Sequence, residues 1–251
     1  MRKPYQGVWN IVRFNWHFYL LSLMMISLLF LLQFVVPESY HFLLHLFIVT
    51  IIFTTFISLI ISFYIYDCSS LYRLDWLDKY FNTSIKNSIN IHAGFDETSV
   101  LLNKKFSDSN LKVFDFYDPK IHTEISIKRA RKAYPPYPNT KSIQTHYLPL
   151  ESKSADAIFV LLSAHEIREK KERNIFFREL KRVLKIDGKI IIVEHLRDIP
   201  NFLAYTIGFF HFYPKSVWLE TFQDTNLRLV EELKITPFIS TFILSNYGNT
   251  P

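Results

Sequence analysis

The chain has 251 residues, of which 49% are hydrophobic, 17% aromatic and 21% charged, a composition that excludes an intrinsically disordered protein. Its one cysteine, Cys68, excludes an internal disulfide, a cysteine-rich zinc site and an iron–sulfur cluster. The formal net charge of +6 comes from lysines and arginines scattered among acidic residues, so we expect no nucleic-acid partner.

Two long segments without a charged residue open the chain. The first covers residues 14–36 and the second covers residues 40–66, with Glu38 between them. At about 1.5 Å per helical residue, each is long enough to cross a bilayer core of about 30 Å. A two-span transmembrane hairpin is therefore predicted over residues 1–67. A cleaved signal peptide is the alternative for the first segment, but its apolar run is too long and lacks a small-residue cleavage site.

The charges that flank the two segments predict their orientation. Arginines and lysines precede the first segment and follow the second, whereas the connection carries only Glu38. Because cytoplasmic flanks are enriched in positive charge, we expect a multi-pass membrane protein whose termini and downstream domain are cytoplasmic. His41 and His45 lie one helical turn apart, a spacing that suits a metal ion, although packing at the membrane interface is the simpler interpretation.

Charged residues become frequent after residue 67. Residues 68–87 place apolar side chains at about every third position, which predicts an amphipathic juxtamembrane linker helix. Such a helix would lie along the membrane or cover the edge of a sheet. A separate domain is expected over residues 88–251.

Short apolar runs alternate with helical patterns in this domain. The runs that predict strands are 88–93, 111–116, 142–146, 155–162 and 189–194. A helix is predicted over residues 167–185, with its end at Gly188. Two further runs, 227–236 and 238–244, predict an antiparallel pair. The expected fold class is α/β, a Rossmann-like doubly wound seven-stranded sheet with an antiparallel last strand, preceded by the transmembrane hairpin.

Four segments in the second half carry a family resemblance. They are residues 148–150, 154–158, 162–167 and 177–189, which read LPL, SADAI, LSAHEI and FRELKRVLKIDGK. In this order they resemble the third-strand exit, the fourth strand with its following turn, and the helix and fifth strand of the class I S-adenosylmethionine-dependent methyltransferases. The resemblance covers most of residues 70–246 and implies S-adenosyl-L-methionine as the cofactor.

The same resemblance implies a set of cofactor contacts. These are Asn90, His92, Gly94 and Asp96 in the first-strand loop, Asp115 at the ribose, Phe116, Gln144 and Thr145 at the adenine, and Ser163 after the fourth strand. Gly94 matches a glycine position of the family, but Asn90 replaces an acid, and His92 and Asp96 replace the outer glycines. These side chains stand where backbone normally approaches the cofactor. Turn capping is the alternative role for Asp115.

The catalytic candidates follow the fourth strand. His165 and Glu166 lie at the carboxyl end of the sheet, where open α/β folds bind ligands, and His165 is the first choice for a base. Helix capping is the alternative for both residues. His195 and His211 are secondary candidates, and no residue is assigned as a metal ligand. The apolar residues 203–212 would line an acceptor pocket, enter the membrane surface or form a core helix.

Together these features predict a membrane-anchored methyltransferase. Its acceptor would be a hydrophobic small molecule or lipid of the quinone, isoprenoid or aryl pigment type, because the anchor places the domain beside the bilayer. The alternative is a catalytically inactive methyltransferase-like scaffold or partner subunit at the membrane, with a protein partner. Saturable binding of S-adenosylhomocysteine distinguishes the two.

Overall fold

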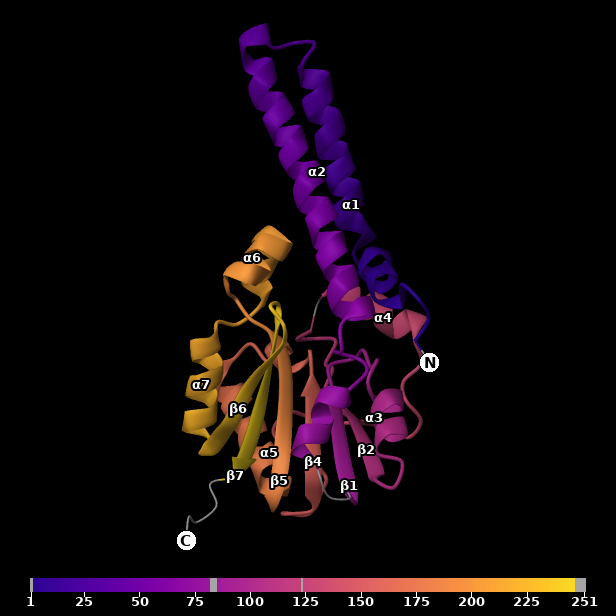
Figure 1. Cartoon of the computed structure of the whole chain (residues 1–251), viewed down its shortest axis with the longest axis vertical. Helices are drawn as coiled ribbons and strands as arrows, with labels where there is room; N and C mark the ends of the chain where they lie inside the picture. The colour runs from indigo at the N-terminus through magenta and orange to yellow at the C-terminus, as the bar shows by residue number, and fades with distance from the viewer. Residues whose placement is uncertain (1, 82–84, 123, 247–251) are drawn as a thin grey trace.

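The structure, a computed structural model, describes residues 2–81, 85–122 and 124–246. A long helical hairpin rises from a three-layer domain in which helices cover both faces of a sheet (Figure 1). The hairpin consists of α1 (Gln6–Leu32) and α2 (His41–Phe63), joined through the 3-10 helix η1 (Glu38–Tyr40). Both helices are long and apolar enough to cross a membrane by length and composition.

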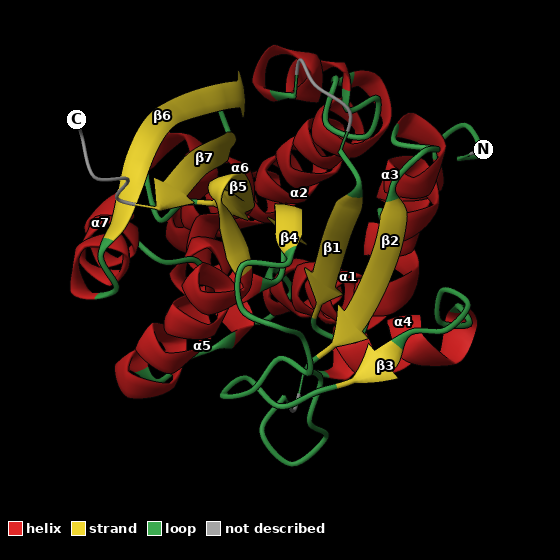
Figure 2. Cartoon of the chain, turned by 90° about the horizontal axis from the view of Figure 1, so that it is seen from below, coloured by secondary structure: helices red, strands yellow, loops and turns green. Residues whose placement is uncertain are grey.

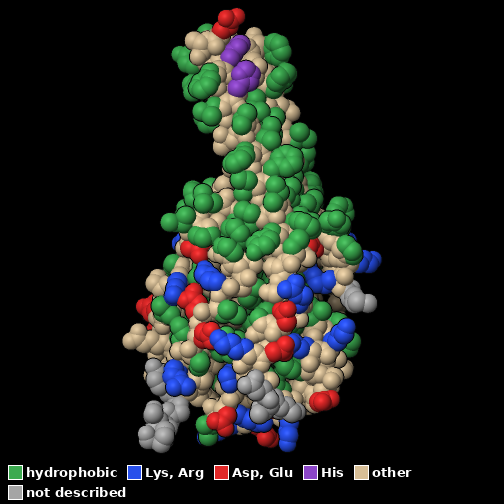
Figure 3. Space-filling model, in the orientation of Figure 1, with side chains coloured by type: hydrophobic (Ala, Val, Ile, Leu, Met, Phe, Trp, Pro, Cys, Tyr) green, Lys and Arg blue, Asp and Glu red, His purple; other side chains and the backbone are tan. Residues whose placement is uncertain are grey.

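The surface of the hairpin is hydrophobic on its outside. Figure 3 shows apolar side chains over nearly its whole length, and most of the large ones are exposed rather than packed in a core. An exposed apolar surface of this extent marks an interface with a membrane or with another protein. The base of the hairpin differs, because Phe14 and Ile65 are buried where the helices meet the domain.

The sheet has seven strands. They are β1 (Asn87–His92), β2 (Asn110–Asp115), β3 (Lys141–Ser142), β4 (Ala155–Leu161), β5 (Leu184–His195), β6 (Leu227–Thr236) and β7 (Ile239–Asn246). Their spatial order is β3-β2-β1-β4-β5-β7-β6, with β1 to β5 parallel and β7 antiparallel to both of its neighbours (Figure 2). The predicted Rossmann-like sheet with a reversed last strand is confirmed.

Helices cover the two faces of this sheet. On one face lie α5 (Lys170–Val183) and α7 (Lys215–Asp224), whose aromatic residues pack on alternate residues of β4 and β5. On the other face lie α3 (Ser99–Lys105) and the 3-10 helix η3 (Asp75–Tyr80). Both faces of β4 are therefore buried, as expected of a central parallel strand.

The remaining helices lie at the carboxyl ends of the parallel strands. They are the π-helix η2 (Tyr64–Cys68), α4 (Ile125–Ala133), η4 (Ala164–Glu166), α6 (Ile199–Tyr205) and η5 (Thr206–His211). Figure 1 shows the hairpin standing at this end of the sheet, with α4 against the base of α1 and α6 beside α2. The N-terminal helices are thus attached to the edge where ligands of open α/β sheets bind.

Two predicted boundaries are wrong. The helix expected to reach residue 185 ends at Val183, and β5 begins at once and runs through Gly188. A Cβ at Gly188 would lie 2.7 Å from Leu184 Cδ1, so this glycine permits close packing within the sheet instead of ending a helix. The predicted third strand, residues 142–146, is reduced to the two residues of β3.

The segment expected as a linker helix is attached to the domain. Among its described residues the only helix beyond the end of η2 is η3, and Leu71, Leu74 and Leu77 are fully buried against one face of the sheet. Their burial joins the base of the hairpin to the domain through a shared core.

Candidate active site

A cavity of about 230 Å³ lies at the carboxyl ends of β1 and β4. Strand ends supply His92, Ser163 and Glu166 to its wall. The opposite wall comes from the hairpin, where Asn10 and Phe14 of α1 line the cavity together with other residues of the first turns. The helix predicted from composition as a membrane span therefore also covers the ligand-binding edge of the sheet.

Hydrogen bonds hold the hairpin in this position. Asp67 accepts from the backbone N–H of Gly7 at 2.7 Å and of Val8 at 2.8 Å, which caps the start of α1. Glu97, in the first-strand loop, accepts from Arg2 at 2.8 Å, from Asn10 at 3.1 Å and from Tyr72 at 2.9 Å. These contacts join the hairpin to the loop that approaches the cavity, and neither carboxylate was foreseen from the sequence.

The predicted first-loop residues mainly stabilise the loop itself. Asp96 accepts from the N–H groups of Thr98 and Ser99, both at 2.9 Å, and so caps α3. Asn90 donates to the hydroxyls of the same two residues at 3.0 and 2.8 Å. His92 differs, because it lines the cavity and its buried Nε2 has no hydrogen-bond partner among the described residues.

Gly94 is required by its surroundings. It has a φ of +89°, and a Cβ there would lie 2.9 Å from the ring of Tyr117 and 3.1 Å from Cδ of Arg131. Asp115, the predicted ribose carboxylate, accepts from Arg131 and, at 2.9 Å, from the N–H of Tyr117. The guanidinium also stacks over the Tyr117 ring at 4.4 Å. The second-strand carboxylate is therefore already paired within the chain.

Three predicted adenine contacts lie away from the cavity. Phe116 is buried in the core against Phe176. Thr145 donates to Glu172 at 2.6 Å, and Gln144 is exposed. Ser163 does line the cavity, and its hydroxyl donates to the carbonyl of Ile91 at 3.2 Å. Ser163, predicted after the fourth strand, therefore lies at the cavity. Gln144 and Thr145, predicted near the end of the third strand, do not.

The two predicted catalytic residues form the centre of a charged cluster at the ends of β4 and β5. His165 Nδ1 lies 2.6 Å from Glu194, whose side chain is fully buried, and its Nε2 lies 3.2 Å from Glu166. Burial alone lowers the pKa of His165, but the carboxylates of Glu194 and Glu166 outweigh it and raise that pKa to about 10. An imidazole in this state carries a proton at neutral pH and is no free base.

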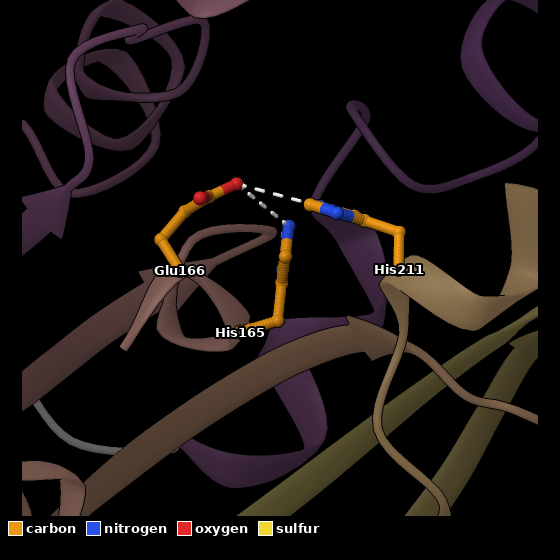
Figure 4. A group of neighbouring side chains, drawn as sticks. All are labelled: His165, Glu166 and His211. Atoms are coloured by element: carbon orange, nitrogen blue, oxygen red, sulfur yellow. Dashed lines mark ion pairs between the residues drawn. The ribbon is translucent and has the colours of Figure 1, made fainter. Parts of the chain in front are cut away.

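His211, from η5, completes the cluster. Its Nε2 lies 3.5 Å from Glu166 and its Nδ1 lies 2.8 Å from Glu124 (Figure 4 shows His165, Glu166 and His211). Burial raises the pKa of Glu166, but hydrogen bonds from His165 and His211 outweigh it and hold that pKa well below its usual range. Glu194 was not foreseen, although a single acid after the apolar residues 190–193 is an unusual feature of a buried strand.

His195 adopts a different state only one residue further along. Its Nε2 lies 2.7 Å from the hydroxyl of Tyr66 and its Nδ1 lies 3.0 Å from Asn201. Burial lowers its pKa to about 4, so this imidazole is neutral at physiological pH. It connects the turn at the end of α2 to the end of β5, which is a structural role.

Comparisons with known proteins identify the domain. The family described as "Methyltransferase domain" matches residues 120–192, which run from before α4 into β5. No curated protein matches the chain. The family match and the sheet order agree, so the predicted resemblance to the S-adenosylmethionine-dependent methyltransferases is confirmed for this part of the chain.

Solved methyltransferases share the fold at low sequence identity. The PH0226 protein of Pyrococcus horikoshii OT3 has a TM-score of 0.51 and 17% identity, covering 69% of this chain and 89% of its own. A methyltransferase of Clostridium acetobutylicum has a TM-score of 0.51 and 11% identity, with coverage of 71% and 91%. Geranyl diphosphate C-methyltransferase of Streptomyces coelicolor, in complex with Mg²⁺, geranyl diphosphate and S-adenosyl-L-homocysteine, has a TM-score of 0.50, 11% identity, and coverage of 69% and 78%.

S-adenosylmethionine is the cofactor of the methyltransferases that the domain resembles, and the cavity offers polar groups to it. The unpartnered Nε2 of His92 and the hydroxyl of Ser163 are polar groups available to its methionine end. Asp115 would hold the ribose hydroxyls, provided that Arg131 leaves it. When bound, the cofactor supplies an electrophilic methyl group.

Proposed function

We propose that this protein is a membrane-anchored methyltransferase that modifies a hydrophobic small molecule or lipid of the quinone, isoprenoid or aryl pigment type. One observation carries the proposal: α1, whose upper part has the length and apolarity of a membrane span, forms a wall of the cavity with its first turns. An acceptor that leaves the bilayer along this helix reaches the strand ends without crossing water. The charges that flank the hairpin favour a cytoplasmic domain.

A second apolar element supports the same placement. Ile199, Leu203 and Ile207 of α6 and η5 expose 75%, 62% and 81% of their surface. These helices lie beside α2 at the base of the hairpin, and Figure 3 shows apolar side chains widening the hairpin at that level. Helices of this kind bury their apolar side at the headgroup boundary. We therefore favour contact with the membrane surface over the two other interpretations of residues 203–212.

The chemistry that this site offers is the placement of an acceptor beside a methyl donor. Glu166 lines the cavity and His165 contacts Glu166, which supports the proposal that this pair orients the acceptor. Positioning of two reactants is the main contribution that a protein makes to an in-line displacement. Geranyl diphosphate, the isoprenoid bound in one structural neighbour, has the amphiphilic character proposed here for the acceptor.

The test is calorimetric titration of the detergent-purified chain with S-adenosylhomocysteine, followed by transfer of labelled methyl groups to a membrane lipid extract. We expect saturable micromolar binding and a labelled product that partitions into organic solvent. Binding of the cofactor product with label only in water-soluble compounds would contradict the proposed acceptor class.

One observation favours a second candidate, the inactive scaffold. Asp115 is paired with Arg131, and Asn90 and Asp96 of the first-strand loop hydrogen-bond within the loop. A folded chain that binds no S-adenosylhomocysteine would support that candidate and overturn the enzymatic one.

A further inference from the structure

The cluster at the ends of β4 and β5 directs two imidazole nitrogens at one carboxylate oxygen. Nδ1 of His165 faces Glu194. Nδ1 of His211 lies 2.8 Å from Glu124 and 2.6 Å from the guanidinium of Arg168. The Nε2 atoms of both rings face Oε1 of Glu166, at 3.2 and 3.5 Å, and Nε2 of His211 also lies 3.1 Å from Arg168. A proton or a metal cation between these atoms would balance the charge of Glu166.

We propose that His165, Glu166 and His211 bind a divalent transition-metal cation, for which Zn²⁺ is the test ion. The inference goes beyond the proposed function, because a cation binds here whether or not a methyl group is transferred. Imidazole nitrogen and carboxylate oxygen together are donors that zinc accepts readily.

The spacing of the donor atoms matches such a site. The three ligand atoms lie within 4.8 Å of one another. Bonds of about 2.0–2.2 Å at tetrahedral angles place neighbouring ligand atoms about 3.4 Å apart. The distances from Glu166 to the two imidazoles, 3.2 and 3.5 Å, bracket that value. The two imidazole nitrogens, which lie within 4.8 Å of each other, would close on a cation by moving together around Glu166.

The outer residues also match a metal site. Protein imidazoles that bind a metal usually donate their other ring N–H to a carboxylate or carbonyl, which fixes the tautomer and orients the ring. Here both imidazoles have such a carboxylate, Glu194 at 2.6 Å and Glu124 at 2.8 Å. Two imidazole–carboxylate pairs that direct their other ring nitrogens to one carboxylate oxygen form an organised donor set.

The charge of the cluster suits a divalent ion. Glu124, Glu166 and Glu194 bring three negative charges, and Arg168, which lies 2.6 Å from Nδ1 of His211, brings one positive charge. Once both imidazoles are neutral, as metal binding requires, two negative charges remain to be balanced in a largely buried site. A divalent cation balances them.

Three protein ligands leave one position of a tetrahedral ion open. Because Glu166 also lines the cavity, the cation would lie at the cavity wall. An oxygen atom of a molecule bound in the cavity, such as a hydroxyl or a carbonyl, is the ligand that this open position would take.

Zinc binding by the full chain in detergent, free of any histidine tag, tests the site. Competition with a chromophoric chelator should show one tightly bound zinc ion per chain. His211→Ala and Glu166→Gln should each lower the zinc affinity at least about 100-fold. Glu124→Gln should lower it about 10–100-fold, as loss of an outer carboxylate does. His146→Ala, which removes an exposed imidazole outside the cluster, should leave it unchanged.

Melting temperatures of the same variants establish that they fold. Zinc binding that is absent from the wild type, or identical in a folded His211→Ala variant, would overturn the site. Titration with S-adenosylhomocysteine separates this inference from the proposed function. Binding of S-adenosylhomocysteine without zinc removes only the cation site, whereas binding of zinc without S-adenosylhomocysteine removes only the proposed enzyme.

Discussion

The strand ends on the two sides of the cavity satisfy their buried polar groups in opposite ways. At the β1–β2 end, Asp96 caps α3 and Asp115 pairs with Arg131. At the β4–β5 end, Glu166 meets its two imidazole neighbours, and Arg168 lies beside His211. The carboxylates of the first end are held by partners within the chain, although Asn90 Oδ1, His92 Nε2 and Asp96 Oδ2 are buried without a partner among the described residues. The second end brings together the donor atoms for the proposed cation.

This difference changes how much of a ligand's binding energy each end of the site would consume. A carboxylate that already has a guanidinium partner gives up that partner when a ligand arrives, so part of the ligand's binding energy is spent on the exchange. When the donor atoms of a cluster already converge, little of the ligand's binding energy is spent on rearranging them. The β4–β5 end is therefore the better organised half of the site, although the β1–β2 end holds the positions that the family resemblance implies.

The largest effect is expected from Glu194→Ala. Its side chain is fully buried against His165, and removing one partner of a buried pair leaves the other uncompensated. We expect a loss of about 3–5 kcal/mol in the free energy of unfolding. Urea unfolding in detergent, followed by fluorescence, measures it.

The matched control for that variant is Glu231→Ala. Glu231 pairs with Lys79 at 2.7 Å on the surface, where solvent screens the pair, so its loss should lower the free energy of unfolding far less than the loss of Glu194 does. Equal losses in the two variants would show that the β4–β5 cluster is no more tightly coupled than a surface pair.

The pH dependence of stability that His195 produces tests whether the raised pKa of His165 is particular to its cluster. The pKa of His195 in the folded chain is about 4, below about 6.5 in the unfolded chain, because burial disfavours its charge. As the pH falls from 6.5 towards 4, the unfolded state takes up the proton first, so stability present above pH 6.5 is lost. The loss should reach about 3 kcal/mol near pH 4.

Urea midpoints at pH 7 and pH 4.5 measure this loss. His195→Gln keeps a neutral polar side chain, and its stability should fall less over the same interval. A wild type and a variant with the same pH dependence would assign the acid sensitivity to other groups.

The sequence allowed the hairpin and most of the sheet to be predicted, because both follow from local patterns. The absence of charge over two long segments requires no tertiary information, and alternating apolar residues set most strands to within a residue or two. The end of α5 was misplaced because β5 begins at Leu184 through pairing with Ala155, a contact between distant residues. Gly188 was interpreted as the end of the helix, but it permits close packing within the sheet.

The site was predictable only in part, for a related reason. His165 and Glu166 are adjacent in the chain and follow a recognisable strand, so their position was foreseeable. Their partners Glu194 and Glu124 come from other elements, and Arg131 reaches Asp115 from α4. No periodicity in the sequence indicates which distant side chains turn toward one another. The contribution of α1 to the cavity was not predicted, because its apolar composition was already explained by a membrane span.

Asp115→Asn tests whether the closed β1–β2 end still binds the cofactor. An amide keeps the shape but loses the charge that strengthens hydrogen bonds to ribose hydroxyls. We expect about 30-fold weaker binding of S-adenosylhomocysteine, which corresponds to about 2 kcal/mol. Asp118→Asn, three residues further along the chain, is the control and should bind as the wild type does. Unchanged affinity in Asp115→Asn would remove the ribose assignment.

The smallest effect, and the one of opposite sign, is expected from Arg131→Gln. The guanidinium holds Asp115 in the free chain, yet its side chain is 39% exposed, so the ion pair is partly screened by solvent. Because the ribose must displace this pair, removing it should tighten binding of S-adenosylhomocysteine about 3-fold to 5-fold, which corresponds to at most about 1 kcal/mol. Lys132→Gln, the neighbouring exposed cation, should change nothing. Weaker binding in Arg131→Gln would instead mean that the guanidinium contacts the ligand, and the β1–β2 end would then be a preformed site like the β4–β5 end.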